Sequence, residues 1–197
     1  MNTVVAKRYV ALLRGINVGG AKRIAMADLR AVFESLGFVR VRTLLQSGNV
    51  VFDVPENAGH DVDEAFVRTL ETTLETTLES AIESATGVHS STIVFSAARF
   101  RHIVRDNPFA DAADPSRMLI TFCGSPPERP ERIAQARPTD EELAPEKIVV
   151  GTDAIYQWLP DGVLKTKLPA KYTERVAPRC TARNLRTVGK ILQLLEE

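Results

Sequence analysis

The sequence predicts an α+β fold with largely antiparallel sheets. Strand-like and helix-like segments alternate along the 197 residues, and hairpin signals recur in both halves of the chain. Hydrophobic residues make up 44% of the chain and charged residues 25%, which is ordinary for a globular protein. No apolar run approaches the ~18 residues that a membrane-spanning helix needs. We therefore expect one ordinary domain or two small ones, since a domain typically holds about 100 to 200 residues.

The chain begins with a predicted strand and a predicted helix. Residues 9–13 form a short apolar run that ends before Gly15, which is typical of a buried strand. Residues 26–38 predict a helix, with Asp28 in its first turn and Gly37 at its end. Apolar residues at helical spacing mark its buried face: Leu29, Val32, Phe33 and Leu36.

A hairpin is predicted next, over residues 41–54. Two strand-like runs flank Ser47, Gly48 and Asn49, and residues of these types tolerate the positive φ of a tight turn. The first elements of the chain are therefore a strand, a helix and a hairpin.

Residues 63–86 contain an internal repeat, LETTLETTLESAIES, that predicts a long helix. An apolar residue recurs every fourth position, followed each time by a glutamate: Glu71, Glu75, Glu79 and Glu83. Four residues advance about 40° past a full turn, so the apolar stripe winds slowly around the helix. Glutamates four residues apart repel by roughly 0.2–0.5 kcal/mol per pair, so we expect the glutamate face to be solvated. An acidic binding surface is the alternative.

A second series of elements is predicted over residues 93–145. Residues 93–95 and 118–122 are typical of strands, and between them apolar residues at helical spacing predict a helix that Pro108 ends. Residues 125–145 contain five prolines and predict an irregular connection with at most a short helix.

The last part of the chain predicts another hairpin and two helices. Residues 148–159 are strand-like on both sides of Gly151. A helix follows with Pro169 in its first turn and a core face at Leu168, Tyr172 and Val176. A final helix is capped by Asn184 and has this apolar stripe: Leu185, Val188, Leu192 and Leu195.

Charge is segregated along the chain although the formal net charge is zero. Residues 1–52 carry eight basic and two acidic side chains, residues 53–87 carry nine acidic and one basic, and residues 163–195 carry eight basic and one acidic. If the two basic ends lie together, they create a positive field that attracts phosphates or acidic partners. Pairing of these blocks within the fold is the alternative.

Several segments carry a family resemblance. In order, they are YVALLRGINVGGAKRIAMADLR, SLGFVRVRTLLQSGNVVFD, VRDNPF, WLPDG and TARNLRTVGKILQLL. They resemble the bacterial domain of unknown function 1697 family nearly from end to end. The resemblance implies two ferredoxin-like α+β subdomains, which we expect at residues 1–96 and 97–197. It implies no established activity, substrate or cofactor.

The segment RGINVGGAKR, residues 14–23, is the first candidate binding loop. Backbone N–H groups of a glycine-rich loop before a helix form a natural phosphate site. The loop departs from the nucleoside triphosphate motif GxxxxGK[ST], because Ala21 stands at the lysine position and Arg23 at the hydroxyl position. It does not fit the dinucleotide motif GxGxxG either. Anion binding and a tight turn with close helix approach both stay open.

The implied fold gives this loop a neighbour. In a ferredoxin-like unit the loop after the first strand and the hairpin after the second share one end of the sheet. We therefore expect these candidate anion-binding residues to gather there: Arg14, Asn17, Lys22, Arg23, Gln46, Ser47 and Asn49. A buried polar network that holds the loop and the hairpin together is the alternative.

A second candidate set lies in the basic C-terminal segment: Lys165, Lys167, Lys171, Arg183, Arg186 and Lys190, with Asn184 beside them. Arg183 and Arg186 bracket a predicted helix start, where backbone N–H donors are free to bind anions. Single-stranded nucleic acid also needs exposed aromatic rings, and aromatic residues are only 6% of the chain. We therefore do not expect a dedicated nucleic-acid reader.

Nothing in the sequence assembles an active site. The three histidines have no metal-ligand spacing, and HDVDE at residues 60–64 is typical of a helix start. Cys123 ends an apolar strand and is expected to be a small buried hydrophobe. No GxSxG motif is present. We expect no metal and no cofactor.

The sequence therefore favours a cytoplasmic, non-catalytic module, monomeric or weakly dimeric, that binds a phosphate-bearing ligand or an acidic partner on the edge formed by residues 14–23. The alternative is an enzyme that acts on a small anionic metabolite in a groove between the halves. There Arg14 or Lys167 would orient the substrate, and Asp161 would accept a proton. Self-association through a sheet edge is compatible with both hypotheses.

Overall fold

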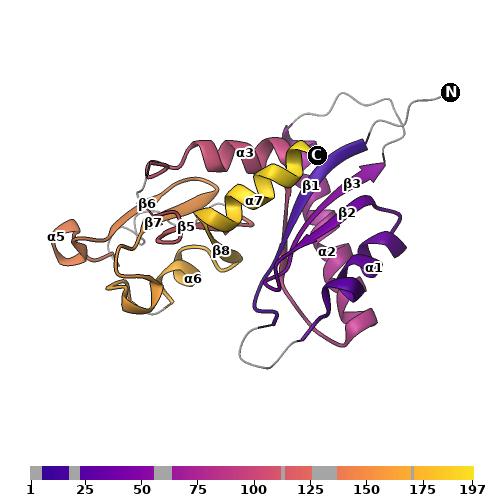
Figure 1. Cartoon of the computed structure of the whole chain (residues 1–197), viewed down its shortest axis with the longest axis horizontal. Coiled ribbons are helices and arrows are strands. Elements are labelled where there is room, and N and C mark those ends of the chain that lie inside the picture. The colour runs from indigo at the N-terminus through magenta and orange to yellow at the C-terminus, as the bar shows by residue number, and fades with distance from the viewer. Residues whose placement is uncertain (1–5, 18–22, 56–63, 112–113, 126–136, 170) are drawn as a thin grey trace. The chain divides into compact units, whose positions relative to one another are not determined.

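The structure is a computed structural model in which the chain divides into two compact units (Figure 1). It describes residues 6–17, 23–55, 64–111, 114–125, 137–169 and 171–197. Unit 1 comprises residues 1–100 and 191–197, and unit 2 comprises residues 101–190. The boundary near residue 96 stays a prediction. No helix in the described ranges is long and apolar enough to span a membrane.

Unit 1 contains a four-stranded sheet with two helices. In chain order the elements are β1 (Ala6–Leu13), α1 (Met26–Ser35), β2 (Val39–Leu44), β3 (Asn49–Pro55), α2 (Glu64–Thr86) and β4 (Thr92–Ser96). The strand order is β2-β3-β1-β4, and every neighbouring pair is antiparallel. This βαββαβ order is the ferredoxin-like arrangement. The predicted strand, helix, hairpin, long helix and strand are confirmed.

Unit 2 repeats this strand order, and the helices between its own strands are much shorter. The remaining elements are α3 (Ala97–Arg105), β5 (Met118–Cys123), α5 (Asp140–Leu143), β6 (Lys147–Val150), β7 (Ala154–Trp158), the 3-10 helix η1 (Val163–Lys165), α6 (Tyr172–Val176), β8 (Cys180–Asn184) and α7 (Leu185–Glu196). The strand order is β6-β7-β5-β8, again antiparallel throughout. The α+β prediction with two antiparallel sheets is confirmed.

Two elements of unit 2 differ from the sequence expectation. Strand β8 was not predicted, because its sequence CTARN has neither an apolar run nor clear alternation; it is held by backbone pairing with β5, from Cys123 opposite Cys180 to Leu119 opposite Asn184. The helix expected around Pro169 begins later, at Tyr172, and is five residues long.

The core of unit 1 lies between its sheet and the helices α1 and α2. The Phe33 ring on α1 meets the Phe52 ring on β3 edge-on, with centroids 5.0 Å apart, and Phe52 stacks on Tyr9 at 5.9 Å. Leu29 is fully buried, and Leu36 is partly buried against the same cluster. The predicted packing of this helix face on the sheet is therefore confirmed.

The glutamate repeat is not the solvated face that the sequence predicted. One carboxylate oxygen of each of Glu71, Glu75 and Glu79, which we call the glutamate ladder, accepts a hydrogen bond from a backbone N–H of β4. The donors are Ser96 at 2.6 Å, Val94 at 2.9 Å and Thr92 at 2.8 Å, in that order. Glu71 and Glu75 are buried.

The repeat distances of the helix and of the strand explain the glutamate ladder. Four helical residues rise about 6.0 Å, and two strand residues rise about 6.6–6.8 Å, so successive glutamates meet alternate residues of the strand. Strand β4 is the last strand of its sheet, so these N–H groups have no partner strand. Glu83, one step further along α2, is exposed and lies 3.2 Å from His89. The expectation of a solvated face is thus right for Glu83 and wrong for the ladder.

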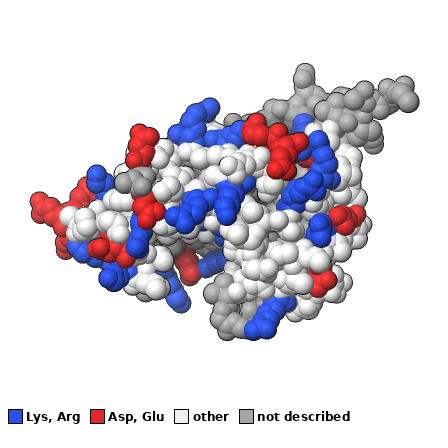
Figure 2. Space-filling view, in the orientation of Figure 1, with Lys and Arg blue, Asp and Glu red and all other residues white. Residues whose placement is uncertain are grey.

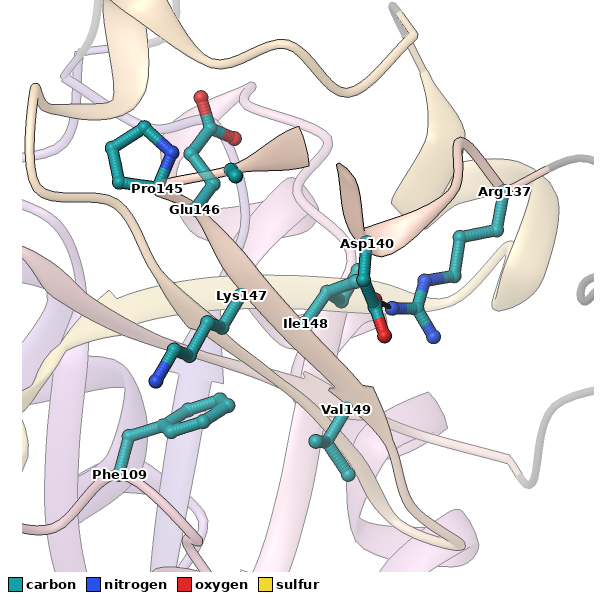
Figure 3. Close-up of a pocket in the computed structure, with 9 residues that line it drawn as sticks. Phe109, Arg137, Asp140, Pro145, Glu146, Lys147, Ile148 and Val149 are labelled. Carbon is teal, nitrogen blue, oxygen red and sulfur yellow. Dashed lines mark hydrogen bonds and ion pairs between the residues drawn. The ribbon is translucent and has the colours of Figure 1, made fainter. Parts of the chain in front are cut away.

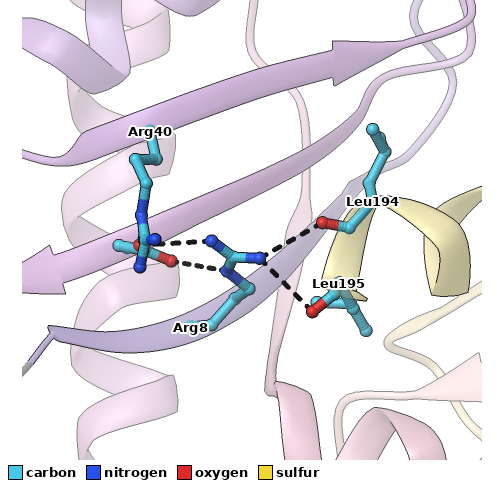
Figure 4. Close-up of polar contacts among 5 residues, drawn as sticks. Arg8, Arg40, Leu194 and Leu195 are labelled. Carbon is cyan, nitrogen blue, oxygen red and sulfur yellow. Dashed lines mark hydrogen bonds and ion pairs between the residues drawn. The ribbon is translucent and has the colours of Figure 1, made fainter. Parts of the chain in front are cut away.

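A buried carboxylate ties the end of α7 to the first sheet (Figure 4). Asp53 on β3 is fully buried and accepts from Arg8 Nε at 2.8 Å and from Arg40. Nη1 of Arg8 also donates to the carbonyls of Leu194 and Leu195, both at 3.3 Å. These carbonyls belong to the last turn of a helix, where cations are favoured. Arg8 therefore joins two segments that are far apart in the sequence.

The core of unit 2 contains both cysteines, which are buried and form no disulfide with each other. Cys123 is fully buried at the end of β5, as expected of a small hydrophobe. The Tyr156 hydroxyl donates to the Ile103 carbonyl at 2.8 Å, and burial raises the pKa of Tyr156 to about 12. This tyrosine is therefore a structural donor at neutral pH.

Candidate functional site

The glycine loop and the first hairpin meet at one end of the unit 1 sheet, as the topology predicted. Strand β3 lies between β1 and β2, with Asn49 opposite both Leu12 and Leu44. The Leu13 N–H donates to the Gly48 carbonyl at 2.8 Å. Gly48 has φ +74°, and a Cβ there would collide with Leu13 and Ile16. Only glycine fits this contact.

Asn17 and Asn49, at this end of the sheet, form hydrogen bonds with backbone groups. The Asn17 amide nitrogen donates to the carbonyls of Gln46 at 2.8 Å and Ile24 at 3.0 Å, and its oxygen accepts from the Ile24 N–H. Asn49 is fully buried, and its amide nitrogen donates to the Leu44 carbonyl and the Ser47 hydroxyl. Both amides therefore close turns, and their predicted role toward a ligand stays a prediction.

The remaining residues of this first candidate set are more accessible. Arg14 is half-buried, and Arg23, Gln46 and Ser47 are exposed. Lys22 lies outside the described residues. On the face in Figure 2, acidic and basic side chains are interspersed.

Two residues of the second candidate set come together in unit 2. Lys165 on η1 and Asn184 at the end of β8 line a cavity of about 380 Å³, which we call the Lys165 pocket. Ser116 and Arg117 line it from the turn before β5. The other lining residues are Leu119, Leu159, Asp161, Gly162, Val163 and Leu164. The pocket thus combines an apolar wall with two cations.

Gly162 lets the loop after β7 approach Arg117. Its φ is +92°, and a Cβ at this position would collide with Nη1 of Arg117. A residue with a side chain would therefore displace the guanidinium from the pocket wall. The sequence motif WLPDG contains this glycine and Asp161.

A fixed anion stands beside the pocket. Asp114 lies 3.8 Å from Arg117 and 3.8 Å from Arg186, and it accepts from the Ser116 hydroxyl at 2.7 Å and backbone N–H at 2.8 Å. The Ser116 hydroxyl and then its N–H hold the pKa of Asp114 below its ordinary value. Desolvation opposes them, and the charges of Arg186 and Arg117 add a lesser lowering. Asp114 is therefore a carboxylate that orients Ser116 and the arginines.

Asn184 caps helix α7, as the sequence predicted. Its side-chain oxygen accepts from the Thr187 N–H at 2.9 Å. The first turn of α7 therefore begins beside the pocket, and the positive end of a helix favours an anion there.

Lys167 and Arg183 do not line this pocket. The Lys167 N–H donates to the buried Glu146 carboxylate at 2.8 Å, and its ammonium group donates to the Ala144 carbonyl. Arg183 is 8% exposed and donates to Thr181 Oγ1 at 2.8 Å. Burial lowers the pKa of Arg183 to about 10. Arg183 also donates to the Ala182 carbonyl at 2.9 Å, so the side chains of both Lys167 and Arg183 contact backbone carbonyls of unit 2.

Sequence reasoning missed Ser116 and Arg117. Their segment, Asp-Pro-Ser-Arg at 114–117, is a turn signal of the kind in which an aspartate bonds backbone and side-chain groups two residues later. The turn was recognisable, but its position beside β8 was not, because β8 was not predicted.

No group of three metal-ligating side chains occurs in the described ranges. The cluster HDVDE was a candidate that falls mostly on residues outside those ranges. His102 lies 3.3 Å from Asp106 on the same exposed helix end.

Comparisons with known proteins relate this chain to a solved structure and to a protein family. Among solved structures, the conserved bacterial protein SP0830 from Streptococcus pneumoniae is similar over 97% of this chain and 99% of its own, with 26% sequence identity and a TM-score of 0.70. Among curated proteins, none matches. The model of the family described as protein of unknown function (DUF1697) matches residues 6–156. Since this match covers more than half of the chain, the protein belongs to the DUF1697 family.

Proposed function

We propose that the protein is a non-catalytic module that binds a small phosphate-bearing ligand in the Lys165 pocket. The observation that carries the proposal is that the cations Lys165 and Arg117 line the same cavity. Arginine offers forked donors and lysine a compact charge, and both suit phosphate oxygens. The start of α7 at Asn184 adds a favourable dipole.

Asp114, which stands beside the pocket and does not line it, is not suited to acid–base catalysis at neutral pH. A general acid or base works best with a pKa near the operating pH. The pKa of Asp114 is instead shifted downward, away from neutrality. This carboxylate orients donors and does not exchange protons at neutral pH.

An enzyme that acts on a small anionic metabolite is the second candidate. Asp161 lines the same cavity as Lys165, so a carboxylate and a substrate-orienting cation share one site. Turnover of a phosphate ester by wild-type protein, lost in Asp161→Asn, would support this candidate.

The edge formed by residues 14–23 stays a secondary proposal for an acidic partner. The amides of Asn17 and Asn49 are used by backbone and hydroxyl groups, so Arg14 and Arg23 would have to carry the binding.

Isothermal titration calorimetry with inorganic pyrophosphate tests the pocket. Loss of a charged hydrogen-bond donor typically costs ~1.5–3 kcal/mol, so Lys165→Ala and Arg117→Ala should each weaken binding by about 10- to 100-fold. Lys171→Ala, an exposed lysine of the same unit outside the pocket, is the matched control and should bind like wild type. Weakening by Arg23→Ala with no effect of Lys165→Ala would assign the anion to the glycine loop instead.

A further inference from the structure

The two cysteines of the chain lie directly opposite each other on neighbouring strands of the second sheet. Cys123 is the last residue of β5, and Cys180 is the first residue of β8. The two strands are antiparallel, and these two residues are register partners. Because the cysteines are far apart in the sequence, only the tertiary fold brings their thiols to one place.

The backbone hydrogen bonds around this pair identify its type. The Cys123 N–H donates to the carbonyl of Asp153, the residue before β7, at 2.9 Å, so it points away from β8. The next bond toward the β8 side runs from the Gly124 N–H to the Arg179 carbonyl at 2.8 Å. Hydrogen-bonded and non-hydrogen-bonded pairs alternate along antiparallel strands, so Cys123 and Cys180 form a non-hydrogen-bonded pair. Such pairs have Cα atoms about 4.5 Å apart, within the range of about 4.4–6.8 Å that disulfides span.

Both thiols lie on the same face of the sheet. Directly opposite residues of two strands point to the same side, and both cysteines belong to one core cluster together with Tyr172 of α6. The Cys123 thiol donates to the Thr121 carbonyl and the Cys180 thiol to the Thr173 carbonyl, both at 3.7 Å. Thiols are weak donors, so a disulfide that replaces these two hydrogen bonds loses little.

We propose that Cys123 and Cys180 form a reversible disulfide when the protein meets an oxidant of the low-molecular-weight disulfide class. The Cys180 thiolate attacks one sulfur of the oxidant, which breaks the S–S bond of the oxidant, forms a mixed disulfide and releases one thiolate. The Cys123 thiolate then attacks Sγ of Cys180, which forms the bond between the two cysteines and releases a second thiolate. The two protein thiols lose two electrons to the oxidant, and their two protons pass to the released thiolates.

The positions of the two thiols decide the order of these steps. Both cysteines are buried, and burial makes a thiol slow to react. Cys180 is 4% exposed, begins an edge strand and follows the exposed residues Pro178 and Arg179. Cys123 is fully buried on a strand that pairs on both sides. Local opening at the end of an edge strand costs less than opening of a central strand, so Cys180 reacts first and oxidation takes minutes to hours.

The disulfide would fix the edge strand β8 to the centre of its sheet. Among the described strands, β8 pairs with β5 alone. A disulfide that closes a long chain segment stabilises a fold mainly by restricting the unfolded chain. Oxidation should therefore lower the equilibrium constant for unfolding of unit 2 by at least about 30-fold. This proposal does not depend on the ligand of the Lys165 pocket.

Intact mass spectrometry of the native protein after incubation with oxidised glutathione tests the proposal. Wild-type protein should lose about 2 Da, the mass of two hydrogens, with no glutathione attached, and dithiothreitol should reverse the loss. Peptide mapping should find Cys123 linked to Cys180, and the urea midpoint of the oxidised protein should rise. Persistent glutathione adducts without the loss, a link between two chains, or no reaction after about a day would each overturn the proposal. An unchanged urea midpoint would overturn the stabilising effect.

A matched control separates strand register from the mere presence of two thiols. The double variant Cys180→Ala with Ala182→Cys moves the second thiol two residues along β8, opposite Thr121. Its Cα atom is then diagonal to that of Cys123, about 7–8 Å away and beyond the range of a disulfide. Because Ala182 is exposed, this variant should carry a glutathione adduct and show no loss of about 2 Da. Formation of the internal disulfide in this variant at the wild-type rate would overturn the role of the register.

Discussion

The two units have the same strand order, but very different helices complete them. In unit 1, α2 is 23 residues long and covers the sheet out to its edge strand. In unit 2, α5 and α6 have four and five residues. The Lys165 pocket and a second cavity of about 460 Å³ beside Phe109 and Pro145 (Figure 3) are both lined by residues of unit 2. The comparison shows how one topology serves as a closed scaffold in one unit and holds cavities lined by basic side chains in the other.

The scaffold role of unit 1 depends most on its core. Phe33 is fully buried against Phe52, so Phe33→Ala should destabilise unit 1 by about 3–5 kcal/mol through lost contacts and the resulting cavity. Urea unfolding measures this loss. Leu164→Ala, at a side chain 98% exposed in unit 2, should stay within about 0.5 kcal/mol. A loss as small for Phe33→Ala would mean that the helix face is misassigned.

The next largest effect is expected at the link between β3 and α7. Asp53→Asn removes the charge that Arg8 and Arg40 share, and it should cost about 1.5–3 kcal/mol, the usual value of a hydrogen bond to a charged group. Because the Arg40 side chain is 60% exposed, Arg40→Ala should cost less than about 1 kcal/mol. Hydrogen exchange should show faster exchange in the last turn of α7 for Asp53→Asn only. Equal losses for both variants would contradict the buried role of Asp53.

The glutamate ladder gives a matched test within one helix. Glu75→Ala leaves the Val94 N–H buried without an acceptor and should cost about 1–3 kcal/mol. Glu75→Gln keeps an acceptor oxygen and should lose less. Glu83→Ala, at the exposed end of the same repeat, should change the free energy of unfolding by less than about 0.5 kcal/mol. If Glu75→Gln were more stable than wild type, the carboxylates would be repelling one another and not capping β4.

The smallest expected effect is a pKa change in unit 2. The pKa of Asp114 is lowered mainly by the Ser116 hydroxyl, so Ser116→Ala should raise it toward the ordinary aspartate value. The sign follows from linkage: a lowered folded-state pKa stabilises the fold above the ordinary value, and this contribution is lost as the pH falls through the lowered value. Ser116→Ala should remove part of that contribution. NMR titration of the Asp114 carboxyl carbon measures this pKa directly. An unchanged pKa in Ser116→Ala would show that the Ser116 hydroxyl does not lower it.

The sequence predicted the fold well where a pattern is local. Helix α1, both hairpins and the Asn184 cap follow from spacing and turn residues, and the ferredoxin-like arrangement followed from the family resemblance. Strand β8 was missed because its pairing with β5 joins residues about sixty positions apart and leaves no local signature.

The candidate site was harder to predict, because a polar side chain has the same signature whether it meets a ligand or a carbonyl. Asn17 and Arg183 were chosen for their donors, and the fold uses those donors on backbone groups. The ladder glutamates show the opposite error, because they were predicted to face solvent and instead accept hydrogen bonds from β4. Repulsion between glutamates within the helix gives no information about N–H groups on a strand that is distant in the sequence. Lys165 and Asn184 belonged to one predicted set, but only the tertiary fold shows that these two members of the set line one cavity.

The contrast between a closed unit 1 and an accessible unit 2 is tested most directly by a ¹H–¹⁵N NMR titration of the whole protein with inorganic phosphate. Our account predicts that the largest amide shift changes occur at Ser116, Gly162 and Lys165, which line the pocket, and that Ser47 and Gly48 of the first hairpin stay unperturbed. Shift changes concentrated at Ser47 and Gly48, with none around Lys165, would contradict it.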